Sequence, residues 1–288
     1  MVPIPDTDSK QSGKRKGTAR GRARQQTMAA KADKHVLYQQ SVQCVESEID
    51  FVDQTFRRIR KRKAQRLRED FCGTANTASE WVRRRRNNVA VGVDLDAEVL
   101  EWGRAHNIAS LGSAGKRLTL IQQDVLKVKT EPMDMVLAMN FSYWLFRDRQ
   151  TMRRYFRSVH KSLVEDGIFF LDAYGGYECY KPSRERTQHK GFTYIWDQAS
   201  YDPISGEMDC YIHFRFPDGS RLDKAFSYSW RFWHLTELRE ILAEAGFPKV
   251  DIYWQGTDEE TGEGNGEFTV AEVGEPDPAW IVYIVAQK

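Results

Sequence analysis

The sequence predicts an α/β fold in which a doubly wound parallel sheet carries a separate antiparallel β-meander. Three observations lead to this prediction. Short apolar strands alternate with amphipathic helices through the middle of the chain. These strands are apolar on both faces, as in a parallel sheet that helices cover on both sides. After residue 190 the apolar period changes to two, the period of a half-buried antiparallel strand.

The composition narrows the class of protein. The 288 residues contain no apolar run near the roughly 18 residues that a membrane-spanning helix needs, and no secretory signal pattern. We therefore expect an intracellular, cytoplasmic protein with no membrane contact. Its thiols are expected to be reduced and to bind no metal, because the cysteines are too widely spaced for a zinc site or a disulfide framework. They are Cys44, Cys72, Cys179 and Cys210.

The N-terminal segment differs from the rest in charge. Residues 1–34 hold nine Lys or Arg against three Asp, a balance of +6, so the remaining residues sum to −4. Residues 1–30 have almost no large apolar side chains, which predicts disorder. A solvated basic tail over 1–34 is the favoured interpretation, and a weak nucleic-acid contact or a targeting role stays open.

The first helical pattern runs from Tyr38 to Lys63 and ends in the basic run 57–63. A second basic run, 83–86, ends the helix predicted after residue 75. Basic residues at a helix C-terminus are favoured by the macrodipole, so both runs are interpreted as solvated helix ends and not as an RNA groove.

The parallel part is predicted from strands and helices in alternation. A strand, a tight turn and a helix occupy residues 67–82, and an amphipathic helix covers Met152–Leu163, with Gly167 closing it. Four further strands are predicted at Val89–Asp94, Leu118–Ile121, Asp134–Met139 and Ile168–Asp172.

The antiparallel part is predicted as a three-stranded meander with turns at 202–206 and 217–220. Its strands centre on Phe192–Trp196, Met208–Phe216 and Leu222–Phe232. A helix then ends at Gly246, and the last two strands lie near Val250–Trp254 and Trp280–Val285.

Four consecutive strand ends carry polar or small residues that suit a nucleoside. Gly73 lies in the turn between the first strand and its helix, where free N–H groups face the crevice. Asp94 ends the next strand and can accept from two ribose hydroxyls. Asp124 and Asn140 follow the third and fourth strands, with Asp124 placed to accept from an adenine amino group. Their convergence predicts one nucleoside-shaped site.

These motifs resemble the class I S-adenosylmethionine-dependent methyltransferases over roughly residues 38–288, most specifically over 67–172. Glu69 matches the acidic position of the family's glycine-rich turn and Gly73 its central glycine, while Phe71 and Ala75 replace the two outer glycines. The resemblance implies a seven-stranded, Rossmann-like α/β fold with the meander inserted after the fifth strand. It also implies S-adenosyl-L-methionine as the cofactor.

The resemblance, with the strand ends, assigns the candidate site. The cofactor-binding candidates are Arg68, Glu69, Cys72, Gly73, Thr74, Ala75, Asp94, Leu95, Asp124, Val125 and Asn140. The predicted walls of the substrate pocket are Tyr38, Tyr143 and Trp144. No catalytic residue is assigned, because His213 is expected to be a solvated strand residue and His234 a helix-start residue. No metal is expected.

The predicted division of the chain has five parts. They are a disordered basic tail (1–34), a helical cap (35–66), a cofactor-binding core (67–189), an antiparallel insertion for substrate or dimer contacts (190–233), and a C-terminal helix with two strands (234–288).

The expected function is N- or O-methylation of a small organic acceptor. An RNA or protein methyltransferase that uses the basic tail, and a non-catalytic relative that only binds the cofactor, are the alternatives. A homodimer through the insertion is a further expectation, and nucleic-acid binding is disfavoured. Residues 250–287 contain nine acids and no Lys or Arg. A solvated acidic loop is the favoured interpretation of their Gly-rich stretch. The alternative is a lid over the site, which would favour a cationic or amine-bearing acceptor.

Overall fold

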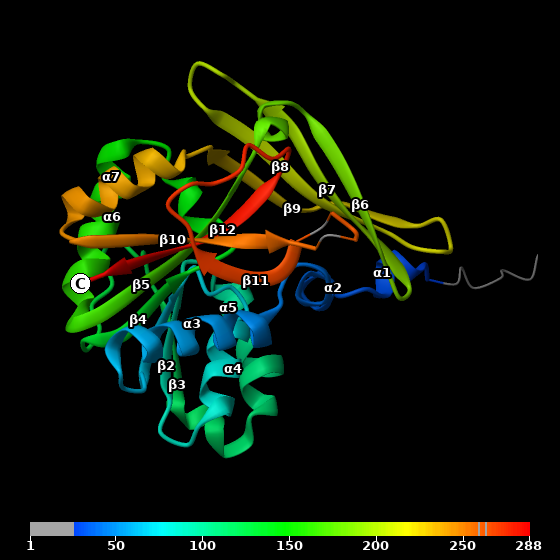
Figure 1. Cartoon of the computed structure of the whole chain (residues 1–288). Helices are drawn as coiled ribbons and strands as arrows, with labels where there is room; N and C mark the ends of the chain where they lie inside the picture. The colour runs from blue at the N-terminus through cyan, green and yellow to red at the C-terminus, as the bar shows by residue number, and fades with distance from the viewer. Residues whose placement is uncertain (1–25, 259, 263) are drawn as a thin grey trace, which may run out of the picture.

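The computed structural model describes residues 26–258, 260–262 and 264–288, and it contains two sheets (Figure 1). The larger sheet has eight strands in the order β11-β10-β12-β5-β4-β1-β2-β3, and the smaller has four in the order β6-β7-β8-β9. The predicted α/β fold with an antiparallel insertion after the fifth strand is confirmed. The larger sheet holds the seven predicted strands and one more at its edge.

The strands of the larger sheet follow the predicted order along the chain. They are β1 (Arg66–Asp70), β2 (Val89–Asp94), β3 (Leu118–Gln122), β4 (Met133–Ala138), β5 (Leu163–Gly175), β10 (Lys249–Thr257), β11 (Gly264–Val270) and β12 (Trp280–Gln287). The first five pair in parallel, and β12 lies antiparallel between β5 and β10. The carboxyl ends of β1 to β5 therefore share one edge.

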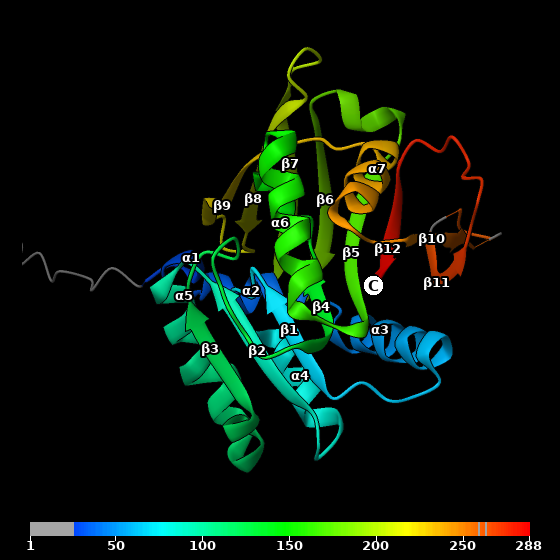
Figure 2. The same cartoon turned by 90° about the vertical axis from the view of Figure 1, so that its left-hand side faces the viewer.

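Helices cover both faces of this sheet, as Figure 2 shows for α6 and α7 in front of it. On one face Val136 and Ala138 of β4 share a core with α6 and α7. On the other face Met135 and Leu137 share a core with α3, α4 and α5. The helices are α3 (Val45–Arg60), α4 (Asn76–Arg84), α5 (Ala97–Gly103), α6 (Arg149–Ser162) and α7 (Leu235–Ala245). Alternate residues of one strand are thus buried on opposite faces, which is why these strands are apolar throughout.

Short helical turns complete the connections of the larger sheet. A π-helical turn covers Arg104–Ile108, and 3₁₀ turns cover Gly112–Arg117, Ser142–Leu145 and Tyr177–Tyr180. The helix α6 ends at Ser162, before the predicted stop at Gly167, because β5 already begins at Leu163.

The smaller sheet begins earlier than the meander predicted from residue 190. Its strands are β6 (Ser183–His189), β7 (Phe192–Tyr201), β8 (Glu207–Arg215) and β9 (Arg221–Arg231). The two predicted turns are present, and β6 is an additional strand that pairs with β7 through a turn at Gly191. Residues 183–189 are polar and mostly exposed, so β6 has no apolar alternation that would predict it.

The N-terminal segment corrects the prediction of a disordered tail over 1–34. Residues 1–25 lie outside the described residues, but α1 (Met28–Lys31) and α2 (Lys34–Ser41) are folded. The N–H of Met28 donates to Asp218 Oδ2 at 2.7 Å, and the N–H of Ala29 donates to Ser220 Oγ at 3.0 Å. Thr27 and Asp33 cap the two helices. These local caps and the contacts to the β8–β9 turn supply the order that apolar composition alone does not predict.

The single helix predicted over Tyr38–Lys63 is two helices, with a break at residues 42–44 between α2 and α3. Leu37 of α2 packs against the smaller sheet, whereas Ile49 and Val52 of α3 pack against the larger one. Because of this break, residues 34–60 contact both sheets, α2 the smaller and α3 the larger.

The acidic stretch after Val250 is an edge hairpin and not a lid loop. Its residues form β10 and β11, which pair antiparallel from Tyr253–Val270 to Thr257–Gly264. Glu259 and Glu263 lie outside the described residues.

The two basic runs are engaged in intramolecular ion pairs. Arg62 lies 2.8 Å from Asp134 and 2.6 Å from Asp166, and Arg85 lies 2.6 Å from Asp53. Arg84 pairs with Glu80 and with Asp50. These arginines fasten α3 and α4 to the core, so they give no support to an RNA groove.

Candidate functional site

Two adjoining cavities lie between the carboxyl edge of the larger sheet and the smaller sheet. The first has a volume of about 460 Å³ and lies over the ends of β1, β2 and β4. The second has a volume of about 390 Å³ and lies between β5, β12 and the smaller sheet. Both are lined by Tyr38, Asn140, Tyr228 and Trp230. This shared wall makes them two chambers of one site, which we call the cofactor chamber and the acceptor chamber.

The turn after β1 lines the cofactor chamber with an unusual backbone. Phe71, Gly73 and Ala75 all have positive φ, at 57°, 51° and 54°. The turn therefore adopts the left-handed conformation at all three positions where the related motif carries glycine, although two of them carry side chains. The ring of Phe71 packs against Phe146 and Tyr155, at centroid distances of 5.9 and 5.6 Å. This packing offsets the backbone strain at Phe71.

Asp94 holds this turn against the end of β2. Its Oδ2 accepts from the N–H of Gly73 at 2.8 Å, and its Oδ1 accepts from the N–H of Asp96 at 3.0 Å. A carboxylate has about four acceptor positions, so two bonds leave capacity for further donors. Asp94 lines the cofactor chamber, where a ribose diol would supply such donors.

Buried carboxyl groups lie beneath the cofactor chamber. Burial, with nearby acidic groups, raises the pKa of Glu69 to about 8, although its Oε2 accepts from the N–H of Ala78 at 2.8 Å. Burial also raises the pKa of Glu48 to about 7, and Glu48 accepts from Thr77 Oγ1 at 3.3 Å. At neutral pH Glu69 therefore favours its neutral form, and Glu48 is protonated in a large share of the molecules.

Asp172 fixes the shared wall between the chambers. Its two carboxylate oxygens accept from the N–H groups of Asn140 and Phe141, at 2.7 and 2.9 Å. Both of these residues have φ of 56°. Burial raises the pKa of Asp172 to about 7. Asp172 thus supports a strained turn that presents Asn140 to both chambers.

The helix α2 covers the cofactor chamber. Lys34, His35 and Tyr38 line it from this helix. The helix is attached to the core because Gln39 Nε2 donates to Thr74 Oγ1 at 2.8 Å. At its N-terminus, Trp102 Nε1 donates to Asp33 Oδ2 at 2.7 Å.

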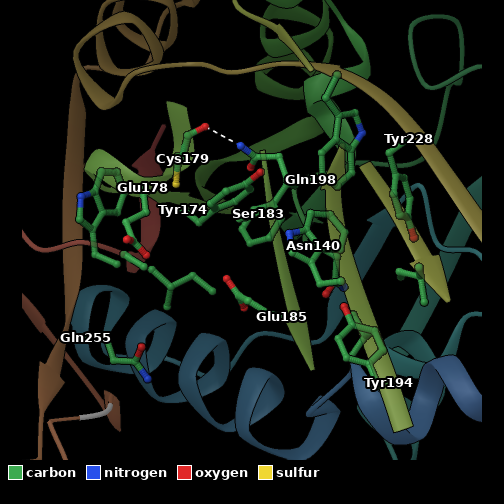
Figure 3. A pocket seen from close by; sticks show the side chains of 18 of the residues that line it. Asn140, Tyr174, Glu178, Cys179, Ser183, Glu185, Tyr194, Gln198, Tyr228 and Gln255 are labelled. Atoms are coloured by element: carbon green, nitrogen blue, oxygen red, sulfur yellow. Dashed lines mark hydrogen bonds between the residues drawn. The ribbon is translucent and has the colours of Figure 1, made fainter. Parts of the chain in front are cut away.

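The acceptor chamber has aromatic walls and acidic polar groups. Figure 3 shows Glu185 pointing into the middle of this chamber, with Tyr174 and Tyr194 among the side chains around it. Glu185 has no hydrogen-bond or ion-pair partner among the described residues, whereas Glu178 is paired with Lys181 at 2.8 Å. The lining contains no Lys, Arg or His within the described part of the chain. Its aromatic residues are Tyr38, Phe141, Tyr174, Tyr194, Trp196, Tyr228, Trp230 and Trp280.

The wall of the acceptor chamber is tied across the insertion. Gln198 Nε2 of β7 donates to the carbonyl of Cys179 at 2.7 Å, the bond drawn in Figure 3, and to that of Lys181 at 2.9 Å. These bonds fix the segment after β5 to the smaller sheet.

Several of the residues predicted from the sequence come together here. The cofactor chamber is lined by Glu69, Cys72, Gly73, Thr74, Asp94 and Asn140, and Tyr38 lines both chambers. Leu95, Ala75, Asp124 and Val125 lie near the same sheet edge but do not line the chamber. The carboxylate of Asp124 instead accepts from the N–H of Leu126 at 2.9 Å.

Three of the predicted side chains are in the core, and the structure corrects their assignment. Arg68 is fully buried, lies 2.9 Å from Asp70 and lines neither chamber. Tyr143 is fully buried and donates to the carbonyl of Asp172 at 2.7 Å. Trp144 is also fully buried, and its ring stacks on Tyr174. Sequence spacing places these residues near the site, but only packing determines that they face inward.

The sequence analysis did not select the insertion residues of the site. Tyr228 and Trp230 belong to the apolar face predicted for β9, so alternation indicated their burial but not the chamber they line. Glu185 carried no signal, because β6 itself was not predicted.

The two histidines have structural partners. His234 is the N-cap of α7, in a capping box with Glu237, as expected. His213 is only partly exposed, and its Nε2 lies 3.2 Å from Asp197 Oδ2, so it is not the solvated residue that was expected. Within the described ranges no group of three or more His, Cys, Asp or Glu could hold a metal ion. In that same part of the chain no helix is long and apolar enough to cross a bilayer.

Comparison with known families agrees with the position of the cofactor chamber. The family model described as a methyltransferase domain matches residues 70–171, which contain the turn, Asp94 and Asn140. No curated protein matches the sequence.

Solved structures share the fold at low sequence identity. A S-adenosylmethionine-dependent methyltransferase from Clostridium acetobutylicum superposes with a TM-score of 0.63 at 17% identity, covering 87% of this chain and 96% of its own. CalS10, an amino pentose methyltransferase from Micromonospora echinaspora solved with S-adenosylmethionine bound, gives 0.60 at 15%, covering 86% and 95%. The sugar N-methyltransferase KedS8 from a Streptoalloteichus species gives 0.58 at 16%, covering all of both chains.

Proposed function

We propose that this chain is a class I S-adenosylmethionine-dependent methyltransferase that methylates an amine of a small organic acceptor, and the methyltransferase-domain match over residues 70–171 supports the first part of this proposal. The observation that carries the proposal is the acceptor chamber, which is aromatic, contains an unpaired carboxylate and no basic side chain among the described residues, and shares a wall with the cofactor chamber. Aromatic faces and a carboxylate both attract an ammonium group.

The residues of the cofactor chamber fit the cofactor. Asp94 retains acceptor capacity for ribose hydroxyls, and a Cβ at Gly73 would meet no atom within 4 Å, so the turn leaves open space beside its backbone. The carboxylates of Asp94 and Asp96 in the lining suit a ligand that carries positive charge.

The protein contributes to the reaction by binding the two reactants, orienting them and excluding water from the site. S-adenosylmethionine supplies a methyl group that is already activated by its sulfonium sulfur. The shared wall of Tyr38, Asn140, Tyr228 and Trp230 supports a transfer in which the acceptor nitrogen and that methyl group meet between the two chambers. Alignment of two reactants in a chamber of this kind supplies a large part of a transfer rate.

Glu185 has the role of holding the acceptor and receiving its proton. An alkylammonium is protonated at neutral pH and has no free electron pair for attack, so it must lose a proton before transfer. The Glu185 carboxylate faces the chamber and has no other hydrogen-bond partner among the described residues. It is therefore the group that binds the ammonium and accepts the proton on a carboxylate oxygen.

The experiment uses a metabolite extract incubated with methyl-labelled S-adenosylmethionine to identify the product that gains one methyl group. The purified acceptor is then assayed with Glu185→Gln, for which we expect kcat/KM to fall by roughly 100- to 10,000-fold, as for loss of a general base, with the cofactor Kd unchanged. Glu178→Gln is the matched control, because its carboxylate is already paired with Lys181. A product methylated on oxygen or carbon would refute the amine, and equal loss in both variants would refute the role of Glu185.

A further inference from the structure

A third cavity opens on the far side of the acceptor chamber. It has a volume of about 290 Å³ and lies between the β10–β11 hairpin and the segment that leads into β12. It shares four lining residues with the acceptor chamber: Gln255, Ala279, Trp280 and Ile281. The cavity thus adjoins the acceptor chamber at these residues, and we call it the tail subsite.

Glycines make the space in which the side chains of the tail subsite lie. A Cβ on Gly264 would stand 2.5 Å from the side chain of Gln255, and one on Gly274 would stand 2.5 Å from the ring of Trp254. A Cβ on Gly175 would stand 2.2 Å from the ring of Trp280. Three separate segments thus carry glycine at the positions where another side chain packs closely against the backbone. The positions of Trp254, Gln255 and Trp280 are set by the backbone around them.

The chemistry of the tail subsite suits an uncharged ring that bears hydroxyl groups. The rings of Trp254 and Trp280 have their centroids 5.1 Å apart and are tilted by 40°, so they offer flat apolar surface at the cavity. Gln255 and Asp277 supply an amide and a carboxylate, which accept from hydroxyl groups. No Lys, Arg or His lines the cavity within the described ranges. A phosphate group would meet only negative or neutral groups here, which opposes its binding.

We propose that the acceptor spans both cavities, with its amine in the acceptor chamber and an uncharged, hydroxyl-bearing ring in the tail subsite. This proposal rests on the proposed function, because it assumes that the amine is the methylated group. It makes Trp254 and Gln255 specificity-determining residues that bind the acceptor without contacting the reacting atoms. It also disfavours acceptors that are phosphorylated at the end distant from the amine.

The test compares three probes that share one amine: tyramine, its 4-O-glucoside and its 4-O-phosphate. With cofactor saturating, we expect the glucoside to exceed tyramine at least tenfold in kcat/KM and the phosphate to fall below tyramine. Trp254→Ala should bring the ratio of glucoside to tyramine close to one while leaving the value for tyramine unchanged. Gly274→Ala, which displaces the same ring, should lower the ratio as well. Val273→Ala is the control, because this neighbouring side chain is 87% exposed.

The outcomes separate this proposal from the proposed function. A glucoside no better than tyramine, or equal losses for both probes in Trp254→Ala, would overturn the tail subsite and leave amine methylation standing. If no probe is methylated, glucoside binding is measured by calorimetry on the full chain saturated with S-adenosylhomocysteine. Binding of the glucoside that Trp254→Ala abolishes would support the subsite and count against the amine as the methylated group. Absence of such binding would overturn the subsite.

Discussion

The two chambers of the site differ in the kinds of groups that line them. The cofactor chamber is formed largely by backbone turns and short polar side chains at the ends of three neighbouring parallel strands, with Gly73 and Asp94 only 21 residues apart in the chain. The acceptor chamber is formed by large aromatic side chains from segments as distant as Tyr38 and Trp280. The strand-end part of the first follows from local sequence motifs, although α2 and β9 complete its walls, whereas the second exists only when distant segments pack together.

This difference between the chambers predicts that cofactor affinity depends on few residues at the strand ends. Asp94→Ala should cost roughly 1–3 kcal/mol of cofactor binding, about 5- to 150-fold in Kd, because it removes the acceptor for the Gly73 N–H and the acceptor proposed for the ribose. Asp124→Ala should leave Kd unchanged, since Asp124 does not line the chamber. Calorimetry with S-adenosylmethionine on folded variants measures both. Equal losses in the two variants would mean that the ligand extends to the third strand.

The helices α1 and α2 contact both the smaller sheet and the turn after β1, so their removal should lower the stability of the protein. Deletion of residues 1–33 should remove the contacts of α1 to Asp218 and Ser220 and the cap of α2, at a cost of about 2 kcal/mol. For a chain of this size that lowers the melting temperature by roughly 4–8 °C. Deletion of 1–25 removes none of these contacts, so its melting curve should match that of the full chain. A shift of equal size after both deletions would contradict the role of α1.

Stability should depend on pH through the buried acids under the cofactor chamber. The pKa of Glu48 is raised to about 7, above its unfolded value near 4.5, so the folded state holds a proton that the unfolded state releases. The free energy of unfolding should therefore fall as pH rises from about 4.5 to 7, by up to about 3 kcal/mol for this group. Urea unfolding at pH 5, 6 and 8 measures the effect.

Glu48→Gln provides the comparison for this pH dependence, because the amide oxygen can still accept from Thr77. The variant should lose less stability than the parent chain between pH 5 and 8. Identical slopes in the two proteins would show that Glu48 does not hold the proton.

The smallest expected effects come from the turn of the cofactor chamber, where two residues with the same φ should respond in opposite directions. Ala75→Gly should stabilise the protein by up to about 1 kcal/mol, since glycine adopts positive φ without a Cβ penalty. Gly73→Ala should destabilise it by roughly 1 kcal/mol for the same reason. Thermal unfolding of both variants checks the pair. Changes of the same sign would show that packing, not backbone conformation, controls this turn.

The sequence predicted the elements whose signal is local. The apolar strands of the parallel sheet, both turns of the meander and the end of α7 at Gly246 agree with the structure. Asp94 and Gly73 could be placed at one edge because parallel strands that alternate with helices must align their carboxyl ends.

Elements without a local apolar pattern were not predicted. The strand β6 is polar on both faces and exists because β7 offers it a hydrogen-bonding edge. The small helix α1 is ordered by its contacts to the β8–β9 turn, which lies about 190 residues away in sequence. Such contacts have no counterpart in the composition of the segment.

By itself, then, the sequence determined the doubly wound fold and the position of the cofactor chamber, since both depend on periodicity and on residues close in the chain. Only the tertiary structure decided which aromatic residues face the acceptor. Tyr143 and Trp144 are adjacent to the site in sequence yet lie in the core, while Glu185 and Tyr228 face the chamber from the smaller sheet. The physical reason is that side-chain direction follows from the packing of one sheet against the other, and no short stretch of sequence encodes that packing.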